Sequence, residues 1–208
     1  LQYGLKLKEK EQLKIQSFNT GSFMHETIDE FFEYVRQEGL SLAELEEEQI
    51  TKIVFEIIEN NLKMSKNYIF TATAKYKVLV RRLKKIVSKA LKYIIETIIY
   101  SDFSIEGTEV EFGKNGRYKP IVLEIGEGKK VEITGKIDRI DTSKNEDGKY
   151  LRIIDYKSSA KNIDLNEVYA GLQIQLLTYT DAICREEDIM PAGVFYFSLL
   201  EQMVKADK

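Results

Sequence analysis

The sequence predicts a mixed α/β (α+β) domain in which a central sheet is flanked by helices. Residues 20–100 carry apolar side chains at helical spacing, whereas residues 104–157 alternate between apolar and polar side chains as strands do. A helical segment and a last apolar strand follow, and this order is typical of a sheet covered by helices. The 208 residues, 43% of them hydrophobic, suffice for one sizeable core, so we expect a single domain.

Two helices are predicted at the start of this order. The segment 20–37 repeats apolar residues at helical spacing, and Thr20 or Ser22 can cap its first turn. The residues Ser41–Glu44 fit a capping box, which should open a second helix that ends near Lys63.

A third, long helix is predicted over roughly 72–100, with two different stripes on its surface. The apolar stripe comprises Leu79, Leu83, Ile86, Ala90 and Ile94, and the basic stripe comprises Lys77, Arg81, Lys85, Lys89 and Lys92. The segment 38–59 before it is rich in glutamate. Such an asymmetry is compatible either with charged faces in solvent or with a binding surface for a polyanion.

Strands dominate the second half. Residues 104–113 alternate with period two and predict a strand. The segments 131–141 and 149–157 are separated by a Glu-Asp-Gly turn, so they should pair as an antiparallel hairpin. A helix over 165–187 and a strand over 193–200 complete the predicted order.

Composition narrows the possible surroundings of the chain. The formal net charge of −3 indicates no particular partner, and the single cysteine, Cys184, excludes an internal disulfide, which fits a reducing compartment. No apolar run reaches the roughly 20 residues that span a bilayer, and the first residues lack the apolar core of a signal peptide. We therefore expect a cytoplasmic protein without membrane contact. The abrupt ends, without an initiator Met, lead us to expect a fragment of a larger protein.

The strand 149–157 ends in two opposite charges. Because side chains alternate along a strand, Asp155 and Lys157 project from the same face as Ile153. In the predicted hairpin, Asp138 comes close to Asp155. Two neighbouring carboxylates repel each other unless a cation lies between them, and Mg²⁺ suits such oxygen ligands. These residues therefore form a candidate site for metal-assisted phosphodiester hydrolysis, in which Lys157 acts on a water or a phosphate.

Each of these residues also has a purely structural interpretation. Asp155 and Lys157 are compatible with a solvated ion pair at a strand end. His25, the only histidine, lies in an otherwise apolar helix and is either a core residue or a ligand of Mg²⁺ or Mn²⁺. Gln175 and Tyr179 share a helix face, either towards the core or towards the Asp-x-Lys strand as hydrogen-bonding groups.

Four motifs occur in order along the chain: GSFMHETIDEFF, GKIDRID, LRIIDYKSS and GLQIQLLTY. Together they resemble the nuclease domain of the RecB-like branch of the PD-(D/E)xK superfamily, and most of all the C-terminal nuclease domain found in AddAB-type helicase–nucleases, in the B-type subunits. The resemblance covers nearly the whole chain and includes the only histidine. It implies a restriction-endonuclease-like core carried by residues 101–208, with residues 1–100 as a mainly helical part of the same domain.

The resemblance also implies a role for each matching residue. The metal would be held by His25, Asp138, Asp155 and the backbone carbonyl of Tyr156. Lys157 matches the catalytic lysine, and Gln175 and Tyr179 match a Q-x-x-x-Y motif beside the active site and the DNA strand. Glu109 or Glu111 fits a recurrent acidic strand position, where it would either contact substrate or be simply exposed.

As a whole, the resemblance implies a bacterial, Mg²⁺- or Mn²⁺-dependent deoxyribonuclease in a helicase–nuclease complex that processes double-strand break ends for recombinational repair. Its implied partners are single-stranded DNA ends from unwound duplex and a second helicase–nuclease subunit, with exonuclease cleavage of the 5′-ended strand. Related subunits usually hold an iron–sulfur cluster with four cysteines. Cys184 matches none of these, and one thiolate cannot hold a cluster, so we expect the cluster in the full-length parent and not in this chain.

Two other functions remain open from the sequence. One is a stand-alone Cas4-like DNA exonuclease on the same superfold, and the other is an inactive DNA-binding or scaffold module. The intact Asp138, Asp155 and Lys157 argue against the inactive module, because a dead site has no physical reason to keep like charges together. For the basic helix 72–100, solvated charge and contact with DNA phosphates both remain open.

Overall fold

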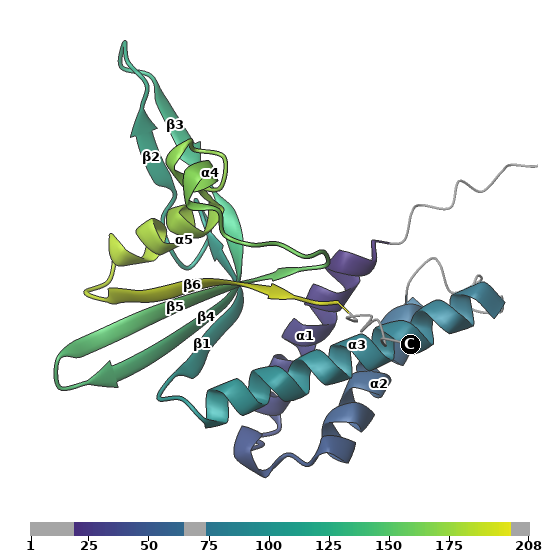
Figure 1. Ribbon diagram of the computed structural model, residues 1–208. Helices are drawn as coiled ribbons and strands as arrows, with labels where there is room; N and C mark the ends of the chain where they lie inside the picture. The colour runs from purple at the N-terminus through teal and green to yellow at the C-terminus, as the bar shows by residue number, and fades with distance from the viewer. Residues whose placement is uncertain (1–18, 65–73, 201–208) are drawn as a thin grey trace, which may run out of the picture.

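The computed structural model describes residues 19–64 and 74–200, which build a four-stranded mixed sheet with helices on both faces (Figure 1). The strands are ordered β1-β4-β5-β6. β1 pairs antiparallel with β4, β4 pairs antiparallel with β5, and β6 runs parallel to β5 at the edge of the sheet. Their bounds are Ser104–Phe112, Gly135–Asn145, Gly148–Lys157 and Met190–Ser198. The predicted mixed sheet and the predicted β4–β5 hairpin are confirmed.

Two apolar clusters join the helices to the two faces of the sheet. On one face, helices α1 (Thr20–Gln37), α2 (Glu47–Met64) and α3 (Ala74–Ile99) pack together over Ile154 and Tyr156 of β5. On the other face, α5 (Gln175–Cys184) packs against β4 and β5. The apolar repeat of each helix at helical spacing explains which of its faces is buried.

The helix starts differ from the prediction in detail. The side chain of Asn19 caps α1, because its Oδ1 accepts hydrogen bonds from the backbone N–H groups of Gly21 and Ser22 at 3.1 and 3.2 Å. The Ser41–Glu44 pattern gives only a short 3₁₀ turn, η1 (Leu42–Glu44), without a side-chain cap, and α2 begins at Glu47. The predicted start of the third helix, at 72–73, lies outside the described residues.

The predicted helix over 165–187 is wrong in one respect, because it is divided in two. Helix α4 (Leu165–Tyr169) ends before Gly171, whose φ of +75° lies in the left-handed region that glycine adopts readily. Helix α5 then starts at Gln175, so the first side chain of the Q-x-x-x-Y motif occupies a helix start. The two helices together form the crossover that a parallel β5–β6 pair requires.

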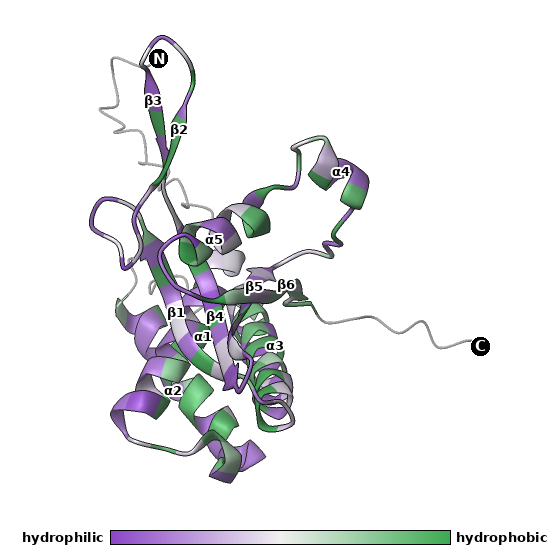
Figure 2. Cartoon of the chain, turned by 90° about the vertical axis from the view of Figure 1, so that its left-hand side faces the viewer, coloured by the Kyte–Doolittle hydropathy of each residue, from purple (hydrophilic) through white to green (hydrophobic). Residues whose placement is uncertain are grey.

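The predicted strand over 131–141 is also two elements. β3 (Lys130–Ile133) pairs with β2 (Ile121–Glu124) in a separate two-stranded sheet, and β4 starts only at Gly135. Figures 1 and 2 show this hairpin extending away from the central sheet. Period-two alternation continues across the break, which is why the sequence pattern alone merges the two strands.

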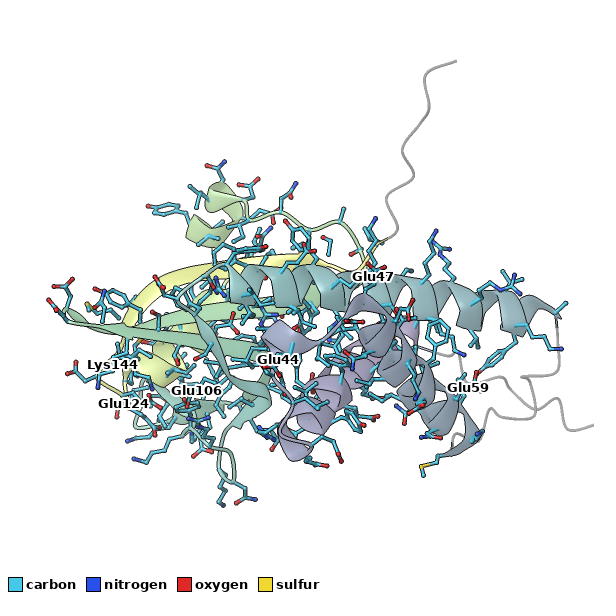
Figure 3. The ribbon with its side chains drawn as sticks, turned by 90° about the horizontal axis from the view of Figure 1, so that it is seen from below. Glu44, Glu47, Glu59, Glu106, Glu124 and Lys144 are labelled. Carbon is cyan, nitrogen blue, oxygen red and sulfur yellow. The ribbon has the colours of Figure 1, made fainter. Side chains whose placement is uncertain are left out.

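Ion pairs between α2 and α3 account for part of the charge asymmetry of these two helices, because they join glutamates of α2 to lysines of α3. Glu59 of α2 lies 2.5 Å from the Nζ of Lys84, and Glu47 forms an ion pair with Lys92; Figure 3 shows both glutamates beside α3. These pairs are partly exposed, so each contributes at most about 1 kcal/mol. None of the helices in the described part of the chain has the length and apolar character that a membrane crossing requires.

Candidate active site

The candidate site lies where β4 and β5 separate. Their ladder runs from Asn145↔Gly148 only as far as Arg139↔Ile154, while β5 stays paired with β6 through Lys157. Beyond the last β4–β5 pair, the backbone N–H of Tyr156 donates to Oδ2 of Asp138 at 2.7 Å, so a side chain replaces the ladder bond. The opening created in this way exposes the carboxylate of Asp138 to groups from other elements.

β1 is irregular directly opposite this opening. Its ladder with β4 pairs Thr108 with Arg139 and Val110 with Ile137. The two residues between these pairs, Glu109 and Asp138, are not paired in the ladder. Glu109 has a φ of +49°, an uncommon conformation for a residue with a side chain. Such strain persists only where the surrounding structure enforces it, and it concentrates at functional sites.

Helix α1 supplies His25 to the opening. The Nδ1 of His25 lies 3.5 Å from Oδ2 of Asp138, and its ring packs edge-on against Tyr156 with 5.7 Å between centroids. The first turn of α1 lies close to the end of β5, because a Cβ at Gly21 would stand 3.2 Å from Oγ of Ser158. A larger residue at position 21 would require the side chain of Ser158 or Asn19 to shift, so this close approach helps to place α1, and with it His25, beside the strand end.

Three of these side chains are arranged as a metal site. One ligand atom from each of His25, Glu109 and Asp138 lies within 4.8 Å of the other two. One imidazole nitrogen and two carboxylate oxygens suit Mn²⁺ or Mg²⁺. Glu109 also forms an ion pair with Lys136. The donor set therefore fits a divalent metal that would displace this lysine.

Asp155 lies next to this group but not within it. The side chain of Asp155 is only 3% exposed, and its Oδ2 is 2.6 Å from the Nζ of Lys157. No hydrogen bond of acceptable angle reaches this oxygen from the described residues, so the contact is an ion pair with an unfilled acceptor. The structure thus brings together His25 and Asp138 as expected, adds Glu109, and leaves Asp155 in contact with Lys157.

The protonation of the site reflects its burial. Burial and then the neighbouring charge of Asp155 raise the pKa of Asp138 to about 7. Burial lowers the pKa of His25, although the charges of Glu109 and Asp155 and a hydrogen bond with the Tyr156 backbone oppose that shift. Burial thus favours the neutral imidazole, which is the form that binds metals.

A chain of polar contacts links Lys157 to α5. The Nζ of Lys157 donates to Oε1 of Gln175 at 3.2 Å, and Nε2 of Gln175 donates to the hydroxyl of Tyr179 at 2.7 Å. The Tyr179 ring is buried edge-on against Phe112, with 5.6 Å between centroids. Gln175 and Tyr179 therefore face the Asp-x-Lys strand, and the buried ring anchors the chain that ends at the lysine.

We expect Tyr179→Phe to reduce DNA cleavage by about fivefold to tenfold while lowering the free energy of unfolding by only about 1 kcal/mol. Phenylalanine retains the packing against Phe112 but leaves Gln175 without its acceptor, so Lys157 loses its orientation. Cleavage rates and urea unfolding of the two proteins measure both effects. Thr178→Val, on the exposed side of α5, is the control, and an equal loss of cleavage there would contradict this role for Tyr179.

A buried ionic network below Tyr156 has no counterpart in the sequence prediction. Arg139 and Asp141 are 3% and 0% exposed, and Nε of Arg139 lies 2.9 Å from Oδ1 of Asp141. Arg152 also donates to Asp141, at 2.8 and 3.0 Å. Arg139 donates in addition to the hydroxyl of Tyr156 at 3.2 Å. The side chain of Tyr156 is thus held between this network and His25, in addition to any role of its carbonyl.

Asp29 is a second residue that the sequence interpretation passed over. It follows His25 by one turn of α1, and burial raises the pKa of its carboxyl, which also hydrogen-bonds to the side chain of Thr108. The spacing of four residues from the only histidine, on one helix face, is the sequence feature that identifies it.

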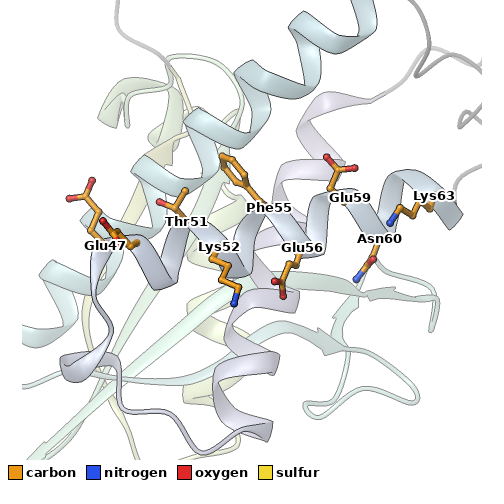
Figure 4. A pocket seen from close by; sticks show the side chains of 9 residues that line it. Glu47, Thr51, Lys52, Phe55, Glu56, Glu59, Asn60 and Lys63 are labelled. Atoms are coloured by element: carbon orange, nitrogen blue, oxygen red, sulfur yellow. The ribbon is translucent and has the colours of Figure 1, made fainter.

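A prominent hollow on the surface of α2 is not this site. It has a volume of about 1090 Å³ and runs along the outer face of α2, lined by residues between Glu47 and Lys63 (Figure 4). Its charged side chains are four glutamates and two lysines, and it contains none of the residues discussed above as site residues. Size alone is therefore a poor guide to the chemistry of this protein.

The family of this chain follows from its sequence similarity to known proteins. Residues 1–208 match the family model described as the PD-(D/E)XK nuclease superfamily. Among the relatives are three proteins that are each named as the B-type subunit of an ATP-dependent helicase/deoxyribonuclease. That of Clostridium novyi is 40% identical, that of Acetivibrio thermocellus 38% and that of Clostridium tetani 34%. Each alignment covers 100% of this chain and 19% of the relative, so the chain spans about a fifth of their length. On this evidence the chain belongs to the PD-(D/E)XK nuclease superfamily.

Proposed function

We propose that this chain is a metal-dependent DNA nuclease domain that hydrolyses phosphodiester bonds at the opening between β4 and β5. The observation that carries the proposal is the gathering of His25, Glu109 and Asp138 within 4.8 Å, beside the buried pair of Asp155 and Lys157. An imidazole, crowded carboxylates and a lysine together favour hydrolysis of a phosphate ester over a purely structural ion pair.

We infer that His25, Glu109 and Asp138 hold Mg²⁺ or Mn²⁺, with Asp155 and the Tyr156 carbonyl as further oxygen ligands on the same side. The ion, when bound, would lower the pKa of a water and polarise the scissile phosphate. Lys157 leaves Asp155 and either orients the attacking water or stabilises the negative charge on the phosphoryl oxygens. Gln175 and Tyr179 keep the ammonium group of Lys157 directed at the site.

The wider setting is part of the proposal. The relatives are named as subunits of a helicase/deoxyribonuclease, which supports a single nuclease domain within a larger protein over a stand-alone Cas4-like exonuclease. We infer that the full-length protein degrades single-stranded ends of unwound duplex in the bacterial cytoplasm, together with a second subunit, during repair of double-strand breaks. An iron–sulfur cluster would belong to the full-length protein.

Cleavage of linear single-stranded DNA by the 208-residue chain tests the nuclease activity. We expect cleavage with Mn²⁺ or Mg²⁺, none with EDTA, and a loss of at least about 10²-fold in Asp155→Asn and in Lys157→Ala. Gel analysis of end-labelled DNA after timed incubation measures the rates. The exposed Asp147→Asn in the β4–β5 turn and Lys144→Ala are the matched controls. Equal cleavage by all of these variants would contradict the assigned site.

A further inference from the structure

A second hollow lies close to the candidate site, between α3 and the edge strand β6. Its volume is about 740 Å³, and α3 contributes Lys85, Lys89, Lys92 and Tyr93 to its lining, while β6 contributes Tyr196 and Phe197. Figures 1 and 2 both show β6 next to α3. We call this hollow the α3–β6 groove.

The chemistry of the α3–β6 groove is that of a surface for a polyanion with planar groups. Three lysines line it against a single carboxylate, Glu96, and one of them, Lys92, is shared with Glu47. Tyr93 is 60% exposed, so its aromatic ring is accessible to a ligand in the groove. Lysines that attract phosphates, combined with open aromatic rings on which bases stack, are typical of sites for single-stranded nucleic acid.

The groove and the candidate active site share a neighbour, the strand β6, which lines the groove and pairs with the end of β5 that carries Lys157. Tyr196 faces Asp155 in the β5–β6 ladder, and the Nζ of Lys157 lies 5.4 Å above the Tyr196 ring. On the other side of β6, Phe197 contacts both Tyr93 and Tyr156, with ring centroids 6.2 and 5.8 Å apart. Because β6 is the edge strand, no further strand of the central sheet separates the groove from Lys157.

We propose that the α3–β6 groove binds the sugar–phosphate chain and bases of single-stranded DNA and leads the strand to Lys157. This inference rests on the proposed nuclease function and adds the place where its substrate lies. A single strand fits better than a duplex, because only unpaired bases offer their faces to Tyr93. The later half of the basic stripe on α3 then has a function, whereas Lys84, outside the groove, is paired with Glu59.

Equilibrium binding of a fluorescein-labelled oligothymidylate, about 20 nucleotides long, in EDTA tests the groove without any cleavage. We expect Lys89→Glu to weaken binding by about tenfold and to reduce the slope of log K against log salt by about 1, because it removes a phosphate contact. We expect Tyr93→Ala to weaken binding by about fivefold or more at every salt concentration, because it removes a stacking ring.

Two matched controls carry the same chemical changes outside the groove. Lys52→Glu reverses an exposed charge on α2, and Tyr100→Ala removes an exposed ring directly after α3. Wild-type affinity in both controls, with the losses above and unchanged melting temperatures, supports the groove. Affinities of Lys89→Glu and Tyr93→Ala equal to those of their controls would overturn it. Failure of the nuclease proposal would be seen in a separate experiment, as equal rates of DNA cleavage by the native chain and by Asp155→Asn.

Discussion

Asp138→Asn is expected to stabilise the metal-free protein at pH 8 and at the same time to abolish its cleavage of DNA. Burial and the nearby Asp155 raise the pKa of Asp138 to about 7, so the folded protein holds this group ionised at pH 8 only at a cost. The difference from the ordinary value of 3.8 corresponds to roughly 4 kcal/mol. Asparagine removes the charge and keeps an oxygen that accepts the hydrogen bond from Tyr156.

The sign of this effect depends on pH. Since the folded pKa lies above the unfolded one, the protonated carboxyl favours folding fully below about pH 4, and that contribution is lost as the pH rises through 7. The advantage of Asp138→Asn over the native chain should therefore be largest above pH 7 and should fade as the pH falls towards 4. Metal binding opposes this advantage, because the carboxylate is a stronger ligand of the ion than the amide: Mn²⁺ at about a thousand times its Kd adds about 4.1 kcal/mol to the native chain, which offsets the advantage of the variant.

Urea unfolding at pH 5 and pH 8, each with EDTA and with Mn²⁺, measures these effects. Asp147→Asn removes a carboxylate from the exposed β4–β5 turn and should change the free energy of unfolding by less than about 0.5 kcal/mol in all four conditions. A native chain that is more stable than Asp138→Asn in EDTA at pH 8, or that gains nothing from Mn²⁺, would show that Asp138 is not a crowded metal ligand.

The sequence predicts the elements around the site better than the contacts within it. Asp138, Asp155 and His25 are found from alternation along strands, from the unusual charge at a strand end and from the only histidine in the chain. These features are local, so a pattern can show them. The helix over 165–187 and the strand over 131–141 are merged in the prediction, because one turn at Gly171 and one residue at Thr134 interrupt periods that otherwise continue.

The place of Glu109 in the site could not be read from a pattern. It depends on the register of β1 against β4, which places Glu109 opposite Asp138, and on the local backbone of Glu109, whose φ is +49°. In a regular strand Glu109 and Glu111 project from the same face, so the sequence alone does not distinguish between them. The contact of Asp155 with Lys157 is likewise a balance of charges that a bound cation would change. Both depend on tertiary geometry.

The ionic network below Tyr156 illustrates the same limit and leads to a second large effect. The GKIDRID motif contains Arg139 and Asp141. From the sequence alone, charged residues in an alternating strand are expected to face solvent. In the structure Asp141 is fully buried and receives Arg139 and Arg152 from two strands. Because Arg139 also donates to Tyr156, whose pKa burial raises to about 12, the network holds a neutral phenol against the ring of His25.

Asp141→Asn should lower the free energy of unfolding by about 3–5 kcal/mol, because it leaves two guanidinium groups, one of them buried, without their counter-charge. Asp181→Asn, which breaks the exposed pair with Arg185 on α5, should cost less than about 1 kcal/mol. Urea unfolding at neutral pH compares the two variants directly. A cost for Asp141→Asn no greater than that for Asp181→Asn would show that solvent reaches the network and that it does not support the site.

If the cost is large, the residual cleavage by the folded fraction should also fall, since Tyr156 and with it His25 would no longer be held in place. The two carboxylates of β4 would then have opposite effects. Asp141 stabilises the fold as an ionised partner of arginines, whereas Asp138, on the same strand, destabilises the fold until a cation binds.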